Sequence, residues 1–97
     1  MLVEEIFKIN RDDELVKIAL THPSFTKENG YSDLENYERL EFFGDSVLKL
    51  YTSKLLYNTY PDAPEGELSK IRSILVSDAI LAQIAKKIGL DKLMILG

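Results

Sequence analysis

Residues 37–48 read YERLEFFGDSVL, and this stretch decides the fold. It contains no proline and a single glycine, and good helix formers dominate it, so we predict that it is helical. At about 3.6 residues per turn, Glu38, Glu41 and Asp45 fall on one stripe of this helix. Stacked like charges repel one another, and burial makes the repulsion worse. A fold keeps such a cluster most readily when a cation binds it, and a hard divalent metal suits carboxylate oxygens best.

Apolar side chains nearly surround these carboxylates on the predicted helix. A second stripe and both flanks of the acidic stripe are formed by Leu40, Phe43, Val47, Leu50, Leu48, Tyr51 and Phe42. On spacing alone, acids one turn apart are most often a solvated helix face. The apolar neighbours favour a metal site instead, and so does Gly44, directly before Asp45. A glycine inside a helix costs about 1 kcal/mol relative to alanine, so it often marks the close approach of a backbone or a ligand.

The stretch ERLEFFGDSVL, residues 38–48, resembles the signature motif of the ribonuclease III family, the endonucleases of double-stranded RNA. Further resemblance lies upstream in ALTHPSF (residues 19–25) and downstream in PEGELS (64–69) and ILVS (74–77). These stretches follow the order and spacing of the family over nearly the whole chain. Phe43 stands where a leucine is commoner, which keeps the position apolar.

The resemblance implies an all-α, ribonuclease III-like endonuclease domain that is truncated before its second acidic helix. In this family a later apolar helix supplies the other half of the metal ligands, as an Asp and a Glu three residues apart. Here the one Asp-x-x-Glu runs from Asp62 to Glu65, in a loop with Pro61 and Pro64. We therefore expect residues 1–97 to form the front part of the domain and to be inactive alone. We also expect the double-stranded-RNA-binding domain that usually follows in this family to lie outside residues 1–97.

The matching motifs also imply roles for individual residues. Glu41 and Asp45 match the metal-binding positions, so we expect them to bind Mg²⁺, or Mn²⁺ as a substitute, directly or through water. Glu38 and Glu65 match acidic positions near the cleavage centre. Glu38 could instead pair with a basic neighbour, and Glu65 could be a first-turn acid that the helix dipole favours. Phe42 is implied as a dimer contact that enters a socket on the partner.

The activity implied by the resemblance is Mg²⁺-dependent cleavage of double-stranded RNA by a homodimer, in the processing of ribosomal and other precursor RNAs. The alternative is a non-catalytic dimerisation or interaction module with the same fold. His22, the sole histidine, is interpreted as structural, since it ends a predicted helix and metal-activated water needs no histidine base.

Composition limits the classes of partner. The formal net charge is −4 and the pI is near 4.9, which argues against strong RNA binding by this chain alone. There is no cysteine, and we find neither a basic aromatic patch nor an apolar stretch long enough for a membrane. The N-terminus lacks the pattern of a signal peptide. We expect one domain in the cytoplasm, without a membrane or a small-molecule cofactor as partner.

The remaining sequence predicts further helices. They are expected over residues 12–21, about 34–60, 65–76 and 77–89, with a polar loop at 27–32. Ser77 is the predicted N-cap of the last helix and Gly89 its C-terminal cap. Leu15, Ile18 and Ala19 are predicted to face inward. The tail, residues 93–97, is apolar, so we expect its burial partner to lie outside this chain.

Overall fold

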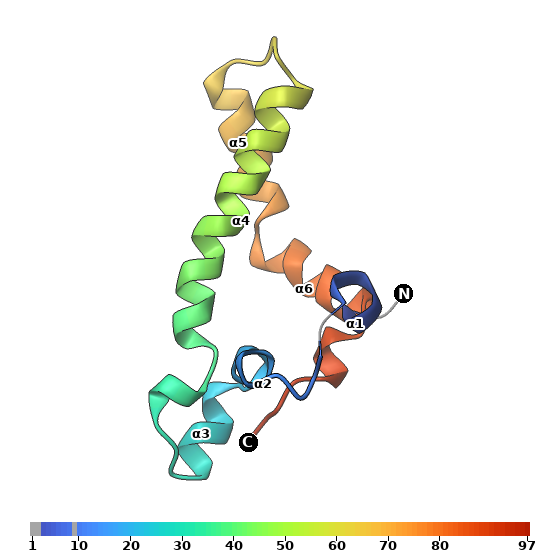
Figure 1. Cartoon of the computed structure of the whole chain (residues 1–97). Coiled ribbons are helices and arrows are strands. Elements are labelled where there is room, and N and C mark those ends of the chain that lie inside the picture. Colours follow the sequence, from blue (N-terminus) through green and yellow to red (C-terminus); the bar gives the residue numbers. More distant parts are fainter. Residues whose placement is uncertain (1–2, 9) are drawn as a thin grey trace.

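The structure is a computed structural model that describes residues 3–8 and 10–97 of the chain. Its described part is built from helices joined by short turns (Figure 1). The elements are α1 (Val3–Phe7), α2 (Glu14–Leu20), α3 (Pro23–Glu28), the 3-10 helix η1 (Asp33–Glu35), α4 (Glu38–Thr59), α5 (Glu65–Leu75), α6 (Asp78–Lys87) and the 3-10 helix η2 (Leu90–Lys92). The predicted all-α class is confirmed, because β pairing in these residues is limited to one isolated bridge.

Helix α4 is the long axis of the molecule (Figure 1). Helix α5 packs against its C-terminal half, and α6 then turns away, so the described elements enclose an open angle. The predicted helix began near residue 34, but α4 begins at Glu38. This start is later because Asp33–Glu35 form a separate 3-10 turn and Asn36 is extended. The predicted end before Pro61 is confirmed.

The segment before α4 differs most from the prediction. Helix α2 begins at Glu14, since the side chain of Asp13 caps it by accepting from the backbone N–H of Leu15 at 2.9 Å. The predicted loop at residues 27–32 is wrong at its start, because Pro23–Glu28 form α3. Pro23 occupies the first turn of that helix, where a missing N–H costs nothing.

The two helices after α4 follow the prediction closely. Ser77 caps α6, its Oγ accepting from the backbone N–H of Ile80 at 3.3 Å. Gly89 adopts φ +79°, the left-handed conformation in which glycine ends helices. The helical turns of α6 end at Lys87, slightly before the predicted end.

The C-terminal tail pairs with the junction of α2 and α3. The backbone N–H of Ile95 donates to the carbonyl of Leu20 at 2.9 Å, and that of His22 donates to the carbonyl of Ile95 at 2.9 Å. The N–H of Gly97 donates to Ser24 Oγ at 3.0 Å. These bonds tie the backbone of the tail to this chain, but Leu96 is still 59% exposed. That the apolar side chains of the tail have their burial partner outside this chain therefore stays a prediction.

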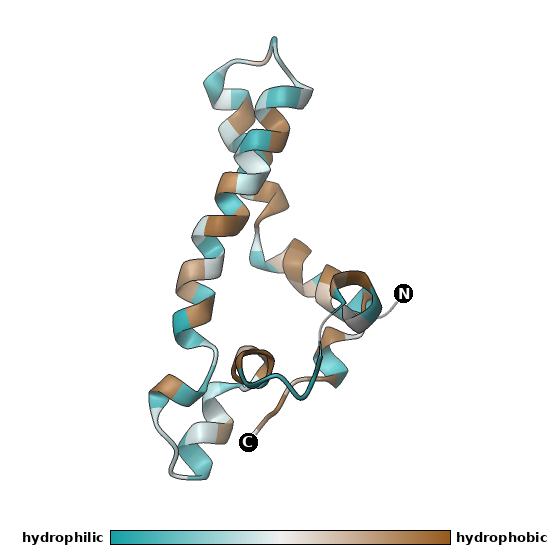
Figure 2. Cartoon of the chain, in the orientation of Figure 1, coloured by the Kyte–Doolittle hydropathy of each residue, from teal (hydrophilic) through white to brown (hydrophobic). Residues whose placement is uncertain are grey.

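Little of the chain's apolar surface is buried. Leu20 and Leu56 are the buried apolar side chains among the described residues, and Leu15 and Ala19, predicted inward, are exposed. The accessible surface is 7728 Å², whereas a compact monomer of this mass exposes about 5,700 Å². Hydrophobic residues recur along the whole length of α4 (Figure 2). The total exposed surface therefore exceeds what a closed domain of this size would leave in water, and many large apolar side chains contribute to it.

No helix in the part of the chain that the structure describes combines the length and the apolar composition needed to cross a bilayer.

Candidate functional site

An open groove of about 660 Å³ lies between the first half of α4 and the turn that joins α5 to α6. We call it the carboxylate groove. Its acidic lining side chains are Glu38, Glu41, Asp45 and Asp78. The first three come from one face of α4, as the helical spacing predicted, and the fourth is the first residue of α6. The structure thus brings the predicted acidic stripe to one concave surface.

Asp78 was not singled out by the sequence, where it follows the N-cap Ser77 and looks like an ordinary first-turn acid. Only the packing of α5 on α4 brings the α5–α6 turn to the acidic stripe. No local pattern could have shown this approach, because it joins residues more than thirty positions apart.

The carboxylates in the groove are open to solvent. Glu38 and Glu41 are exposed, and the side chain of Asp45 is 55% exposed in a pair with Lys49, whose Nζ lies 3.1 Å from Oδ2. In the described residues no three His, Asp or Glu side chains come close enough together to hold a metal ion. Oxygen donors one turn apart suit Mg²⁺ in kind. The carboxylates of this groove supply part of the oxygen ligands that a bound Mg²⁺ would take.

The acidic side chains of the groove also affect Tyr37, the residue directly before α4. Burial, and then the charges of Glu41 and Glu38, raise the pKa of the Tyr37 phenol above its ordinary value of 10.0. The ring of Tyr37 also meets His22 edge-on, with 5.7 Å between ring centroids. The start of α4 is therefore both the most acidic part of the helix surface and a point of tertiary contact.

The structure does not bring Glu65 to the carboxylate groove within this chain. It lines a smaller groove of about 230 Å³ between α4 and α5. One of its carboxylate oxygens accepts from Ser69 Oγ at 2.9 Å, and Arg72 in the same groove donates to Ser53 Oγ at 2.8 Å. Its position in the first turn of α5 fits the helix-dipole interpretation.

Phe42 is 81% exposed. It borders the carboxylate groove and also lines a second, mostly apolar groove of about 650 Å³ between α2, η1 and the start of α4. Exposed Leu15 and Leu34 line the same apolar groove. An exposed aromatic ring next to a mostly apolar groove is typical of a surface that binds another protein.

His22 has a structural role, as interpreted from the sequence, but at a different helix end. Its Nδ1 accepts from the backbone N–H of Ser24 at 3.0 Å and so caps the N-terminus of α3. His22 does not lie at the end of the preceding helix, because α2 ends at Leu20 and the chain is already extended at Thr21.

Gly44 has open space around it. A Cβ atom built there would meet no heavy atom of the described residues within 4 Å, apart from the chain neighbours and the backbone of its own helix. The close approach of a backbone that the sequence suggested is therefore absent from the described part of this chain.

Known proteins are similar to this chain in sequence and in fold. A family model described as Ribonuclease-III-like matches residues 12–97. The chain is 47% identical over 89 residues to Ribonuclease 3 of Corynebacterium efficiens and 48% identical over 90 residues to Ribonuclease 3 of Mesoplasma florum. These matches cover 92% and 93% of this chain but 35% and 38% of the relatives, so the chain spans little more than a third of their length.

Among solved structures, the nuclease domain of ribonuclease III from Campylobacter jejuni matches with a TM-score of 0.83 and 35% sequence identity. The match covers 97% of this chain and 62% of that domain. That structure is described as showing structural flexibility in a region involved in dimer formation. Fold, signature motif and relatives agree, and the chain belongs to the Ribonuclease-III-like family.

Proposed function

We propose that this chain is the front part of a Mg²⁺-dependent endonuclease domain that cleaves double-stranded RNA. The observation that carries the proposal is the placement of Glu41 and Asp45 on one face of α4, at an open groove that a second helix lines with Asp78. Family membership supports a nuclease. The resemblance of the motif to the ribonuclease III signature supports the choice of substrate, with ribosomal and other precursor RNAs as the substrates to test.

The chain's own residues define what the site can do. Glu41 and Asp45 hold the cation, for which Mn²⁺ is a substitute, and Glu38 adds negative charge at the same surface. A bound Mg²⁺ lowers the pKa of its water and neutralises charge on the phosphate. Without it, an acidic groove on a chain of net charge −4 repels the RNA backbone. The acids therefore make substrate binding depend on the cation, and the duplex is read by its shape.

The proposal includes a homodimer. Phe42 and the groove beside it lie on one surface. In an isologous dimer the Phe42 ring of each subunit would enter the groove of the other, so the contact would form twice. The same exposed surface would serve a non-catalytic interaction module, which is the second candidate function. The two candidates differ in whether RNA is cut.

The test compares this chain with a version extended through a downstream helix that carries the second acidic pair. Each is incubated with duplex RNA and Mg²⁺. We expect cleavage by the extended version alone, loss of cleavage with Glu41→Gln, and normal cleavage with Glu67→Gln, an exposed acid on α5 that serves as the matched control.

Robust, Glu41-dependent cleavage by the short chain would contradict the need for a second acidic pair. Cleavage that survives Glu41→Gln would contradict its role at the metal. No cleavage by a folded, extended version would favour the interaction module.

A further inference from the structure

Two polar side chains are among the most deeply buried in the described residues. Asn36 and Thr26 are each 1% exposed, although the chain buries few apolar side chains. A fold tolerates buried polar groups only when their hydrogen bonds are satisfied. The hydrogen-bond partners of these two side chains therefore indicate what the pair does in this small core.

The bonds of this pair form one directed chain. Asn36 Nδ2 donates to Thr26 Oγ1 at 3.0 Å, and Thr26 Oγ1 donates to the carbonyl of Pro23 at 3.0 Å. Asn36 Oδ1 accepts from the backbone N–H of Glu38 at 3.0 Å. The side chains of Thr26 and Asn36 thus connect α3 to the first residue of α4. We call this pair the Asn36–Thr26 latch.

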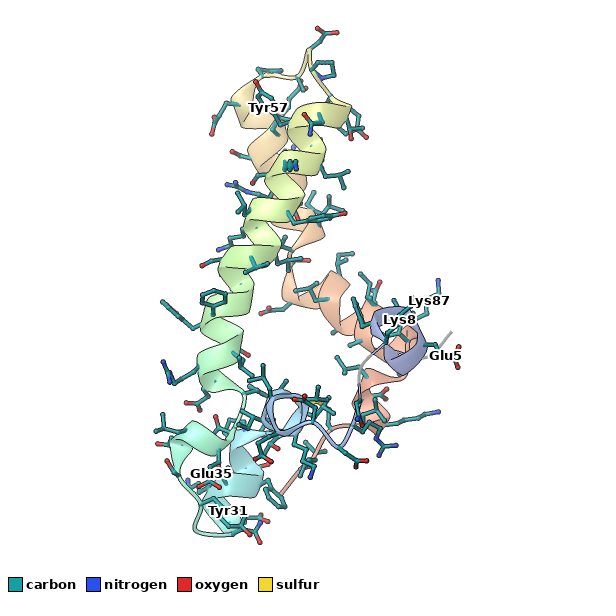
Figure 3. All side chains as sticks on the ribbon, in the orientation of Figure 1. Glu5, Lys8, Tyr31, Glu35, Tyr57 and Lys87 are labelled. Carbon is teal, nitrogen blue, oxygen red and sulfur yellow. The ribbon has the colours of Figure 1, made fainter. Side chains whose placement is uncertain are left out.

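The segments around the latch are fixed as well. The backbone N–H of Tyr37 donates to the carbonyl of Thr21 at 3.1 Å. Ser32, the N-cap residue of η1, forms a reciprocal capping box with Glu35, and Glu35 lies at the same end of the molecule as α3 (Figure 3). The entry of the chain into α4 is therefore held from both sides of Asn36.

The first turn of α4 needs such support. Tyr37, the N-cap residue, makes no side-chain capping bond, so the acceptor for the N–H of Glu38 is supplied by Asn36. The turn also carries Glu38 and Glu41 three positions apart, and like charges at that spacing destabilise a helix. Glu41 is itself bonded into this turn, its N–H donating to the carbonyl of Tyr37 at 2.8 Å.

We propose that Asn36 and Thr26 are positioning residues that hold Glu38 and Glu41 in place for the metal of the carboxylate groove. This inference rests on the proposed function, because it assumes that the groove binds a divalent cation. Neither latch residue touches the groove. Each acts through the backbone of the first turn, so that the carboxylates are ordered before the cation arrives.

Thr26→Val is the sharpest variant, because it removes the hydroxyl and keeps the shape. Thr26→Ser is the matched control, because it keeps the hydroxyl and removes only a methyl group. If the valine variant does not fold, Thr26→Ala replaces it in the same comparison. The first readout is amide hydrogen exchange by NMR at Glu38 and at Leu56, which lies in the distant half of α4. The second is the broadening of Glu41 and Asp45 signals by added Mn²⁺.

For Thr26→Val we expect amide exchange at Glu38 to be roughly three- to tenfold faster, because the variant loses one hydrogen bond of typical strength. Amide exchange at Leu56 should stay unchanged. Broadening at Glu41 should then require a several-fold higher Mn²⁺ concentration. Thr26→Ser should restore both values.

Unchanged exchange at Glu38 in Thr26→Val would overturn the latch. Faster exchange with an unchanged Mn²⁺ response would overturn its positioning role. Should Mn²⁺ fail to broaden Glu41 and Asp45 in the unmodified chain, the proposed metal site fails, and the link from latch to metal fails with it. The exchange data then still show whether the latch orders the turn, so the two failures are distinguishable.

Discussion

Lys49 Nζ lies 3.1 Å from Asp45 Oδ2, one turn further along α4. Both side chains are about half exposed, at 53% and 55%. An exposed ion pair one turn apart stabilises a helix by only a few tenths of a kcal/mol. Asp45 is therefore not held by a strong structural bond, and its carboxylate stays available to a cation that displaces Lys49.

Asp45→Asn should change the free energy of unfolding in EDTA by no more than about 0.5 kcal/mol, because the lost pair is weak and the repulsion with Glu41 is relieved. Added Mg²⁺ should stabilise the unmodified chain and not this variant. Urea melts with and without Mg²⁺ measure both. Lys49→Gln is the control, since it breaks the same pair and should keep the Mg²⁺ effect. A loss of several kcal/mol in EDTA would contradict the exposed pair, and a Mg²⁺ effect retained in Asp45→Asn would contradict the metal site.

Gly44→Ala should stabilise this chain by about 0.5–1 kcal/mol, because alanine is the better helix former and the space beside Gly44 is open. Thermal or urea denaturation measures the gain. Gly30→Ala is the control, and it should destabilise because Gly30 has φ +70°. If Gly44→Ala destabilises the chain, some group does approach this position, as the sequence first suggested.

The phenol of Tyr37 should titrate above its ordinary pKa of 10.0, since burial and the charges of Glu41 and Glu38 raise that pKa. Folding then favours the protonated phenol. The resulting stability is fully present below pH 10 and is lost as pH rises through the raised pKa. Tyrosinate absorbance, taken as the difference from Tyr37→Phe, measures the titration. Glu41→Gln should lower the pKa of Tyr37 only in part, because burial is the larger cause; an unchanged value would show that the Glu41 charge does not reach the ring.

Phe42→Ala should convert a dimer of the protein to monomers. Truncating a buried phenylalanine costs about 3–5 kcal/mol, and a two-fold contact loses two rings, so Kd should rise by at least about a thousandfold. Sedimentation over a dilution series gives the mass, and circular dichroism checks folding. Tyr57→Ala is the control, because Tyr57 is similarly exposed at the far end of α4 (Figure 3). An unmodified protein that is monomeric at high concentration would contradict the dimer, and a dimeric Phe42→Ala protein would place the contact elsewhere.

Local patterns in the sequence were enough to predict much of the fold. Helical spacing placed Glu38, Glu41 and Asp45 on one face, and the caps Ser77 and Gly89 lie where the sequence indicated. These features depend on residues within one or two turns of each other, so sequence alone can predict them.

Other features depend on ambiguous residues or on tertiary packing. The helix that begins at Pro23 was not predicted, because proline suits a loop as well as the first turn of a helix. The entry of Asp78 into the groove depends on how α5 packs against α4. The sequence places Phe43 and Leu50 on one apolar stripe, yet their side chains are 69% and 73% exposed. Periodicity shows which face is apolar and not what covers it.

Direct Mn²⁺ binding tests the central claim, that Glu41 and Asp45 together bind a divalent cation. The fall in the electron paramagnetic resonance signal of free Mn²⁺ is titrated for the chain and for the variants Glu41→Gln, Asp45→Asn and Glu67→Gln. We expect binding to weaken by at least roughly tenfold in the first two variants, because even outer-shell partners of a metal contribute that much. Glu67→Gln should bind as the unmodified chain does. Equal binding by all four proteins, or no binding by any of them, would contradict the claim.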